Sequence, residues 1–119
     1  MTLIYHLAPS SRWYSWPAEK PYLPPDYEKD GFIHCTSGDE LMLKVANRFY
    51  RNVPGDYVLL VLDTTKLKNP ASEVKWEKAS EFDSLFPHIY GAMDRDAVVE
   101  IRRFQRADDG TFVGWTETN

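Results

Sequence analysis

Apolar positions along this chain follow two spacings, one typical of strands and one typical of helices. The most apolar run, Tyr57 to Leu62, lies between Gly55-Asp56 and Asp63-Thr64. Its length, its β-forming residues and its polar flanks predict a central strand that is buried on both faces. Shorter runs also predict strands. They cover residues 3–7, 32–35, 74–78, 97–104 and 112–115.

The clearest helix signal begins at Ser37, where Ser-Gly-Asp-Glu matches a capping box. Ser37 is the predicted N-cap, with Glu40 three residues later. The pattern predicts one apolar face and a helix that ends near residues 50–52. The apolar residues at four-residue spacing are Leu41, Val45 and Phe49.

The remaining segments are predicted from their turn residues. Ser10 and Ser11 are predicted N-caps of a short helix over residues 12–16, because small hydroxyl side chains favour that position. We expect loops over residues 17–30, which are rich in proline, and over residues 82–91, which are rich in aromatic residues. A hairpin turn at 107–111 leads into the last strand.

About six strands and two short to medium helices predict an α+β fold with a split or mixed β-sheet. A length of 119 residues suits one compact domain, so we expect residues 1–119 to form a single domain. We see no internal repeat and no linker. The sequence therefore predicts a single small domain with one core.

Charge and cysteine content narrow the classes of function. The net charge is −4, which argues against nonspecific nucleic-acid binding. Cys35 is the only cysteine, so no internal disulfide forms, which fits a reducing compartment. We find neither a signal-peptide pattern nor a run of membrane-spanning length. We expect a cytoplasmic protein that does not enter a membrane.

Three histidines, each in a short apolar setting, are the first candidates for chemistry. They are His6, His34 and His88. Imidazole donates, accepts or ligates near neutral pH, so the three together suggest one shared pocket and catalytic roles. The alternative is that each is a buried histidine with a satisfied hydrogen bond. Cys35 follows His34 on a strand and faces the opposite side, so we expect an inert buried thiol.

Other residues near these histidines are candidates for ligand binding or catalysis. Thr36 precedes the capped helix, whose first N–H groups attract anions and hydroxyl groups. Tyr90 and Gly91 lie just after His88, where Tyr90 can stack on a planar base. Arg48 is a candidate anion-binding residue or part of a solvated helix face. Glu77 is the carboxylate that we most expect to take part in catalysis.

A zinc site formed by the histidines is a further alternative, since three imidazoles and a water are a known catalytic arrangement. The histidines are 28 and 54 residues apart in the sequence, so no pair has metal-ligand spacing. We therefore expect no metal.

Several short motifs together resemble the domain of unknown function 952 family. The resemblance runs from residue 3 to about residue 104. The motifs are Ile-Tyr-His at 4–6, Gly-Phe-Ile-His-Cys-Thr at 31–36, Val-Ala-Asn-Arg-Phe at 45–49, Leu-Phe-Pro-His-Ile-Tyr-Gly at 85–91 and Asp-Ala-Val-Val at 96–99. The resemblance implies a fold similar to the ADP-ribosyltransferase superfamily, whose cleft holds NAD in relatives.

The resemblance also implies roles for single residues. His6 resembles the histidine that contacts a ribose hydroxyl of NAD. The ADP-ribosyltransferase superfamily has three sequence motifs around NAD, and His6 resembles the first. His34 with Thr36 lies where the second motif would, on the nicotinamide side, and His88 with Tyr90 lies near the third. The glutamate of the third motif is not evident, and His88 or Glu77 is the candidate replacement.

We therefore expect a protein that binds NAD or an ADP-ribosyl nucleotide in a histidine-lined cleft. Its reaction would be transfer or cleavage at the anomeric carbon of the ribose. We expect no tightly bound cofactor, with NAD as a candidate substrate and a small nucleotide as the binding partner. The alternatives are a noncatalytic binding module of the same fold and a metal-dependent hydrolase. The sequence leaves the oligomeric state open.

Overall fold

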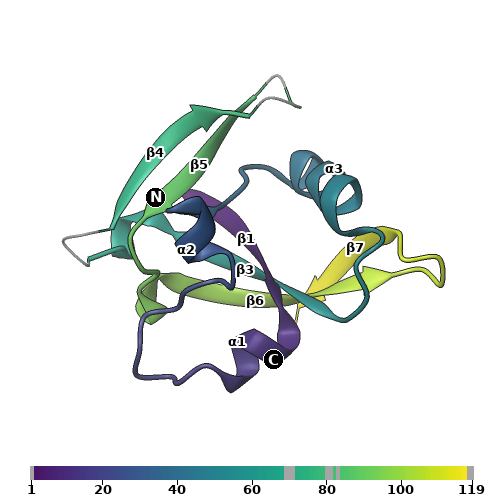
Figure 1. The fold of residues 1–119 in the computed structure, drawn as a ribbon, viewed down its shortest axis with the longest axis horizontal. Helices are drawn as coiled ribbons and strands as arrows, with labels where there is room; N and C mark the ends of the chain where they lie inside the picture. Colours follow the sequence, from purple (N-terminus) through teal and green to yellow (C-terminus); the bar gives the residue numbers. More distant parts are fainter. Residues whose placement is uncertain (1, 69–71, 80–81, 83, 118–119) are drawn as a thin grey trace.

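The computed structural model describes residues 2–68, 72–79, 82 and 84–117 (Figure 1). Within these ranges the chain forms strands, short α-helices and two single-turn 3-10 helices. The strands are β1 (Leu3–Pro9), β2 (Ile33–His34), β3 (Tyr57–Asp63), β4 (Glu73–Lys78), β5 (Leu85–Tyr90), β6 (Val98–Arg106) and β7 (Phe112–Glu117). The helices are α1 (Ser10–Ser15), α2 (Tyr27–Asp30), α3 (Asp39–Tyr50), η1 (Thr64–Lys66) and η2 (Arg95–Ala97).

The strands form two antiparallel sheets, which confirms the mixed α+β class. One sheet has the order β1-β3-β6-β7 and the other has the order β2-β5-β4. The sheets meet where Tyr5 of β1 and Thr36, just after β2, exchange backbone hydrogen bonds of 2.7 and 2.8 Å. Figure 1 shows β4 and β5 rising to one side of α3, with the longer sheet beneath both. The second sheet and α3 therefore face each other across the end of β1.

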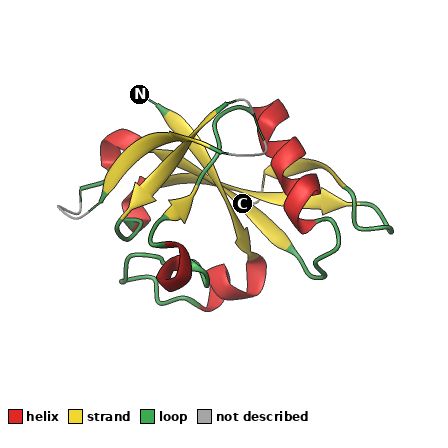
Figure 2. Ribbon diagram, turned by 45° about the horizontal axis from the view of Figure 1, so that its top comes forward, coloured by secondary structure: helices red, strands yellow, loops and turns green. Residues whose placement is uncertain are grey.

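The predicted central strand is confirmed as β3, and every one of its residues is buried. Its side chains alternate between two apolar clusters because successive residues point to opposite faces. Leu60 faces a cluster shared with Ile33 and Ile89 of the second sheet. Leu59 faces a cluster shared with Met42 of α3. The two faces of β3 therefore pack against different elements, one face against the second sheet and the other against α3, and Figure 2 shows these elements in a second view.

Helix α3 confirms the predicted amphipathic helix, but the predicted capping box is wrong. The N-cap is Gly38, with φ of 94°, and no side chain caps the helix. A positive φ at this position favours glycine, so the turn places Ser37 outside the helix. The helix begins at Asp39, whose carboxylate accepts a short hydrogen bond from the Tyr5 hydroxyl. This bond ties the start of α3 to β1.

The loop predicted over residues 82–91 is wrong, because β5 forms the centre of the second sheet. Pro87 argued against a strand there, since proline has no N–H to donate to the hydrogen-bond ladder of a β-sheet. In the structure the Pro87 carbonyl accepts from the Cys35 N–H at 3.1 Å, just beyond the end of β2. Its missing N–H points to that same side, so it takes no bond from the β4 ladder. His88 is therefore held on a strand and not on a loop.

Other segments differ from expectation in smaller ways. Residues 27–30, predicted as loop, form the single-turn helix α2, which Gly31 ends with φ of 78°. Strand β2 is shorter than predicted and covers only residues 33–34, and the backbone of Thr36 pairs with Tyr5 of β1. Helix α1 begins at Ser10, with no side-chain cap from either serine. Among the described residues, no helix is both long and apolar enough to cross a membrane.

The predicted hairpin between β6 and β7 is confirmed, and it closes against the end of α3. The guanidinium of Arg106 donates to the carbonyls of Tyr50, Arg51, Gly55 and Gly110, at 2.6 to 3.1 Å. The last carbonyls of a helix lack partners within the helix, so Arg106 satisfies groups that would otherwise require water. This contact fixes the C-terminal end of α3.

Candidate functional site

Strands β1, β2 and β5 each carry one of the three histidines. His34 and His88 are paired residues of neighbouring strands, so their side chains lie on one face of the second sheet. That face is opposite to Ile33 and Ile89, which are buried in the core. His6 lies on β1 in register with Leu60, on the core side of the larger sheet. The three imidazoles therefore come from two sheets.

The His6 ring is 5% exposed and joins the second sheet by one hydrogen bond. Its Nδ1 donates to the His34 carbonyl at 2.7 Å, which places the proton on Nδ1 and leaves a lone pair on Nε2. That Nε2 atom is buried without a partner among the described residues. Burial lowers the pKa of His6 to about 4, although the bond to His34 acts in the opposite direction. His6 is thus a neutral, buried acceptor.

His34 is paired with a carboxylate from the preceding turn. Its Nε2 donates to Asp30 Oδ2 at 2.9 Å, and 59% of the His34 side chain is exposed. The pairing depends on Gly31, whose positive φ reverses the chain between the two residues. Asp30 therefore orients the His34 ring and leaves Nδ1 open.

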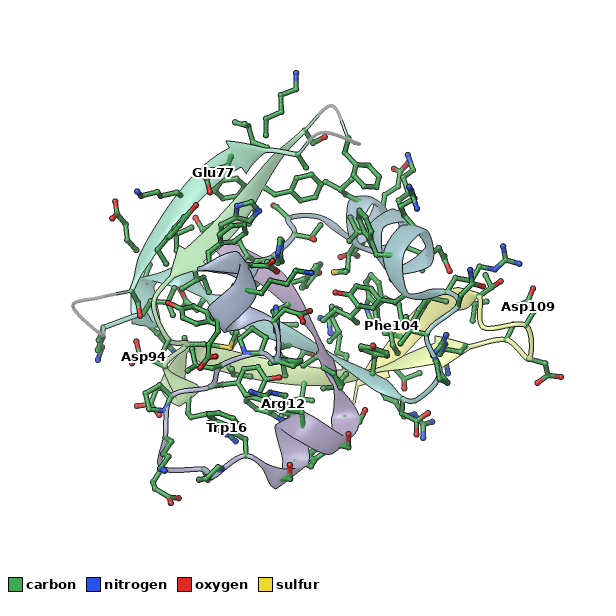
Figure 3. The ribbon with its side chains drawn as sticks, viewed as in Figure 1. Arg12, Trp16, Glu77, Asp94, Phe104 and Asp109 are labelled. Carbon is green, nitrogen blue, oxygen red and sulfur yellow. The ribbon has the colours of Figure 1, made fainter. Side chains whose placement is uncertain are left out.

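His88 is paired with a carboxylate from the edge strand β4. Its Nδ1 donates to Glu77 Oε1 at 2.8 Å, and the Tyr90 hydroxyl donates to the same oxygen at 2.6 Å. Figure 3 shows Glu77 on β4, on the side of the molecule opposite Asp109. The Tyr90 and His88 donors lower the pKa of Glu77 below its ordinary value, and the same bond raises the pKa of the Tyr90 hydroxyl. Glu77 is thus held as an anion against His88.

Aromatic contacts fix the two paired imidazoles relative to each other. The His34 and His88 ring centroids are 5.3 Å apart in an edge-on arrangement. Phe32 stacks on His88 at 4.2 Å and also contacts His34 at 4.6 Å. Tyr90 completes the group at 5.2 Å from Phe32. Ring packing of this kind restrains the imidazoles before any ligand arrives.

Two adjoining cavities open beside these rings, and we call them together the cleft. The inner cavity, of about 120 Å³, is lined by His6 and His34 among others. The outer cavity, of about 500 Å³, is lined by both His34 and His88. The residues that line both are Asp26, Asp30, His34, Thr36, Val45 and Tyr50. His34 therefore stands where the two cavities meet.

The other candidates from the sequence are distributed unevenly around the cleft. Thr36 lines both cavities and is buried, with its backbone bonded to Tyr5. Arg48 lines a separate shallow depression on α3, and its guanidinium lies 5.4 Å from the ring of Phe49. Gly91 follows β5 with φ of 126° and lines neither cavity. Arg48 and Gly91 thus do not line the cleft, and their ligand contacts stay predictions.

Sequence reasoning missed the two aspartates and the aromatic wall of the cleft. Asp30 had a usable signal, since it lies four residues before His34 with a glycine between them. Asp26 had none, because its place depends on the unpredicted helix α2. Phe82 and Phe86 were assigned to a loop, so their shared wall could not be seen. Cys35 behaves as expected: it is 3% exposed, and burial raises the pKa of its thiol.

The described residues give no support to a metal site. Among them, no group of three or more histidine, cysteine or carboxylate side chains is placed to hold a metal ion. The proton on His6 Nδ1 and the carboxylate pairs of the other two histidines leave one free nitrogen on each ring. These nitrogens belong to residues of two different sheets.

Comparisons with known proteins give one family and one similar solved protein. The chain is similar to the crystal structure of protein CC0527 from Caulobacter crescentus, with 27% identity, a TM-score of 0.77 and 94% of each chain covered. A double mutant of the same protein gives 26% identity, the same TM-score and the same coverage. No curated protein matches. The family model of DUF952, described as a protein of unknown function, matches residues 7–101, so the chain belongs to the DUF952 family.

Proposed function

We propose that this protein binds NAD or another ADP-ribosyl nucleotide in the cleft beside His34 and His88. The observation that supports it most is the pair of buttressed imidazoles, Asp30–His34 and Glu77–His88, whose rings lie 5.3 Å apart at the outer cavity. A carboxylate on one ring nitrogen fixes the tautomer and presents the other nitrogen to a ligand. Such a pair suits proton transfer and hydrogen bonding to a ribose.

The proposed reaction breaks the bond between the ribose anomeric carbon and nicotinamide. Nicotinamide leaves as a neutral ring with the bonding electron pair, and a water or an alcohol adds to the anomeric carbon and loses its proton. His34 Nδ1 or His88 Nε2 accepts that proton as a general base. The positive charge that develops on the sugar is stabilised by the nearby carboxylates. The proposed ADP-ribosyltransferase-like fold gives this chemistry its precedent, as a fold analogy.

Glu77 takes part in this proposal through His88 and Tyr90. The sequence lacks an evident third-motif glutamate, and Glu77 supplies a carboxylate from the neighbouring strand instead. It bonds both side chains through one oxygen and leaves the other oxygen unused by these two donors. Its role is to position His88 and to fix the proton on its Nδ1.

One observation favours the alternative of a noncatalytic binding module. Glu77 lines neither cavity, so its carboxylate does not face the space where a ribose would lie. A module would bind the nucleotide with these same histidines and release nothing. The two candidates therefore differ in turnover and not in binding.

The test is to incubate the protein with NAD, measure binding by calorimetry and measure released nicotinamide by chromatography. We expect binding, and release that falls at least about tenfold in His88→Asn, because a general base contributes at least that much. Glu77→Gln should lower the turnover rate more than it lowers affinity. Asp108→Asn, in the distant β6–β7 turn, is the matched control and should behave as wild type. Binding of NAD without release of nicotinamide would favour the noncatalytic binding module. Absence of NAD binding would refute both the enzyme and the module.

A further inference from the structure

The cleft is lined by aromatic and acidic side chains whose chemistry the proposed function does not use. On one side, the aromatic rings of Phe49, Phe82 and Phe86 form a contiguous row, with centroid distances of 6.2 and 5.7 Å. All of them line the outer cavity. Phe49 is 49% exposed, so its ring can be reached from solvent. This row offers flat π-faces to a ligand.

Another part of the cleft lining is acidic. Asp26 and Asp30 line both cavities, and none of the described lining residues is a lysine or an arginine. The pKa of Tyr50 is raised by burial first, and Tyr57, Asp26 and Asp30 raise it further, as expected where negative charge is not neutralised. An anionic group placed in this space would meet carboxylates without a compensating cation.

The nitrogens of the cleft are also acceptors. His6 Nδ1, His34 Nε2 and His88 Nδ1 are the donors in their respective bonds. In the neutral form of each ring, the remaining nitrogen carries a lone pair. On His6 this atom belongs to a ring that is only 5% exposed, lines the inner cavity and has no partner among the described residues. Buried acceptors of this kind require a donor.

We propose that the cleft binds an organic cation: a planar ring that carries positive charge together with N–H donors. The aromatic row attracts the cation through its π-faces. Asp26 and Asp30 neutralise the charge, and the imidazole lone pairs accept its N–H groups. The inference deepens the proposed function and rests on the same cleft, because it states which end of a ligand enters. Phosphates of a nucleotide would lie outside both cavities.

A series of probes with one shape and three charges tests this directly. Benzamidine is a planar cation with N–H donors, benzamide is its neutral counterpart and benzoate is its anionic counterpart. At pH 8, above the ordinary range of histidine, we expect benzamidine to bind at least about tenfold more tightly than benzamide. Benzoate should show no measurable binding. The measurement is a titration monitored by NMR with labelled protein.

Variants locate the preference in the cleft. Replacing both carboxylates, with Asp26→Asn and Asp30→Asn together, should reduce the ratio of benzamidine to benzamide affinity to near one. Phe82→Leu should weaken both probes, because it removes the central ring of the row. Asp108→Asn makes the same change of charge in the remote turn and should keep the wild-type ratio. Thermal unfolding of each variant checks that it is folded.

The outcomes separate this inference from the proposed function. Benzoate binding as tightly as benzamidine would overturn the inference, and so would a ratio that survives removal of both carboxylates. Absence of binding by all three probes would overturn it as well. NAD titrated in parallel tests the proposed function independently. If NAD binds but the three probes show no charge preference, the proposed function stands and the inference is refuted. If the probes show the charge preference but NAD does not bind, the inference stands and the proposed function is refuted.

Discussion

Buried His6 predicts that this protein loses stability as the pH falls from 7 to 5. In the folded state, burial lowers the pKa of His6 to about 4, from an ordinary value of 6.5. In the unfolded chain the ring titrates near its ordinary value. As the pH falls through 6.5, the unfolded state therefore gains a proton that the folded state does not bind. Stability from this group is complete above pH 6.5 and is lost progressively as the pH falls toward 4.

The size of the loss follows from the difference between the two pKa values of His6. At about 1.4 kcal/mol per pKa unit, the whole difference corresponds to roughly 3 kcal/mol of unfolding free energy. Between pH 7 and pH 5 the expected loss is about 2 kcal/mol. Carboxylates contribute little in this interval, because Asp109, Asp63 and Glu77 have lowered pKa values and unfolded carboxyl groups titrate below pH 5.

The assay is urea unfolding at pH 7, 6 and 5, followed by tryptophan fluorescence. The matched variant is His6→Asn, whose amide nitrogen takes the place of Nδ1 and does not titrate. We expect it to be less stable than wild type at pH 7, because it loses ring packing, and to lose much less stability on acidification. His34→Asn changes an exposed ring and should keep most of the wild-type loss. Parallel losses in wild type and His6→Asn would refute this reasoning.

Two further predictions concern the hairpin that closes on α3. Gly110→Ala should lower stability by about 3 kcal/mol, because a Cβ there would lie 2.2 Å from the Arg51 carbonyl oxygen at φ of 92°. Gly55→Ala, with φ of 109° and open space, should lower it by only about 1–2 kcal/mol, and equal effects in urea unfolding would contradict the contact. Arg106→Lys should lower stability by about 2 kcal/mol, since it removes most of the bonds to carbonyl oxygens. Thermal unfolding measures this loss, with Arg103→Lys as the control. Arg103 is exposed, so its replacement should change stability by no more than about 0.5 kcal/mol. Similar losses of stability in both variants would show that the carbonyl contacts are unimportant.

Sequence reasoning succeeded where local pattern and burial agree. The all-buried strand β3, the amphipathic face of α3 and the β6–β7 hairpin are each determined by their own residues, so periodicity was sufficient. The prediction that Cys35 and His34 face opposite sides was correct for the same reason.

Sequence reasoning failed where residues distant in the sequence but close in space determine the structure. Pro87 lies in a central strand because β2 ends beside it, and no property of residues 85–90 reveals that. Gly38 replaced Ser37 as the N-cap because the chain must turn from the bond with Tyr5 into α3. The same limit hid the pairing of Glu77 with His88, which depends on the register of β4.

The claim that His34 and His88 serve one ligand site is tested most directly by histidine-ring NMR with NAD. The chain has three histidines, so three ring signals can be assigned by single substitutions to asparagine. We predict that saturating NAD shifts the His34 and His88 signals together, with the same apparent affinity that calorimetry gives. Signals from both rings that stay unchanged at millimolar NAD would contradict the account.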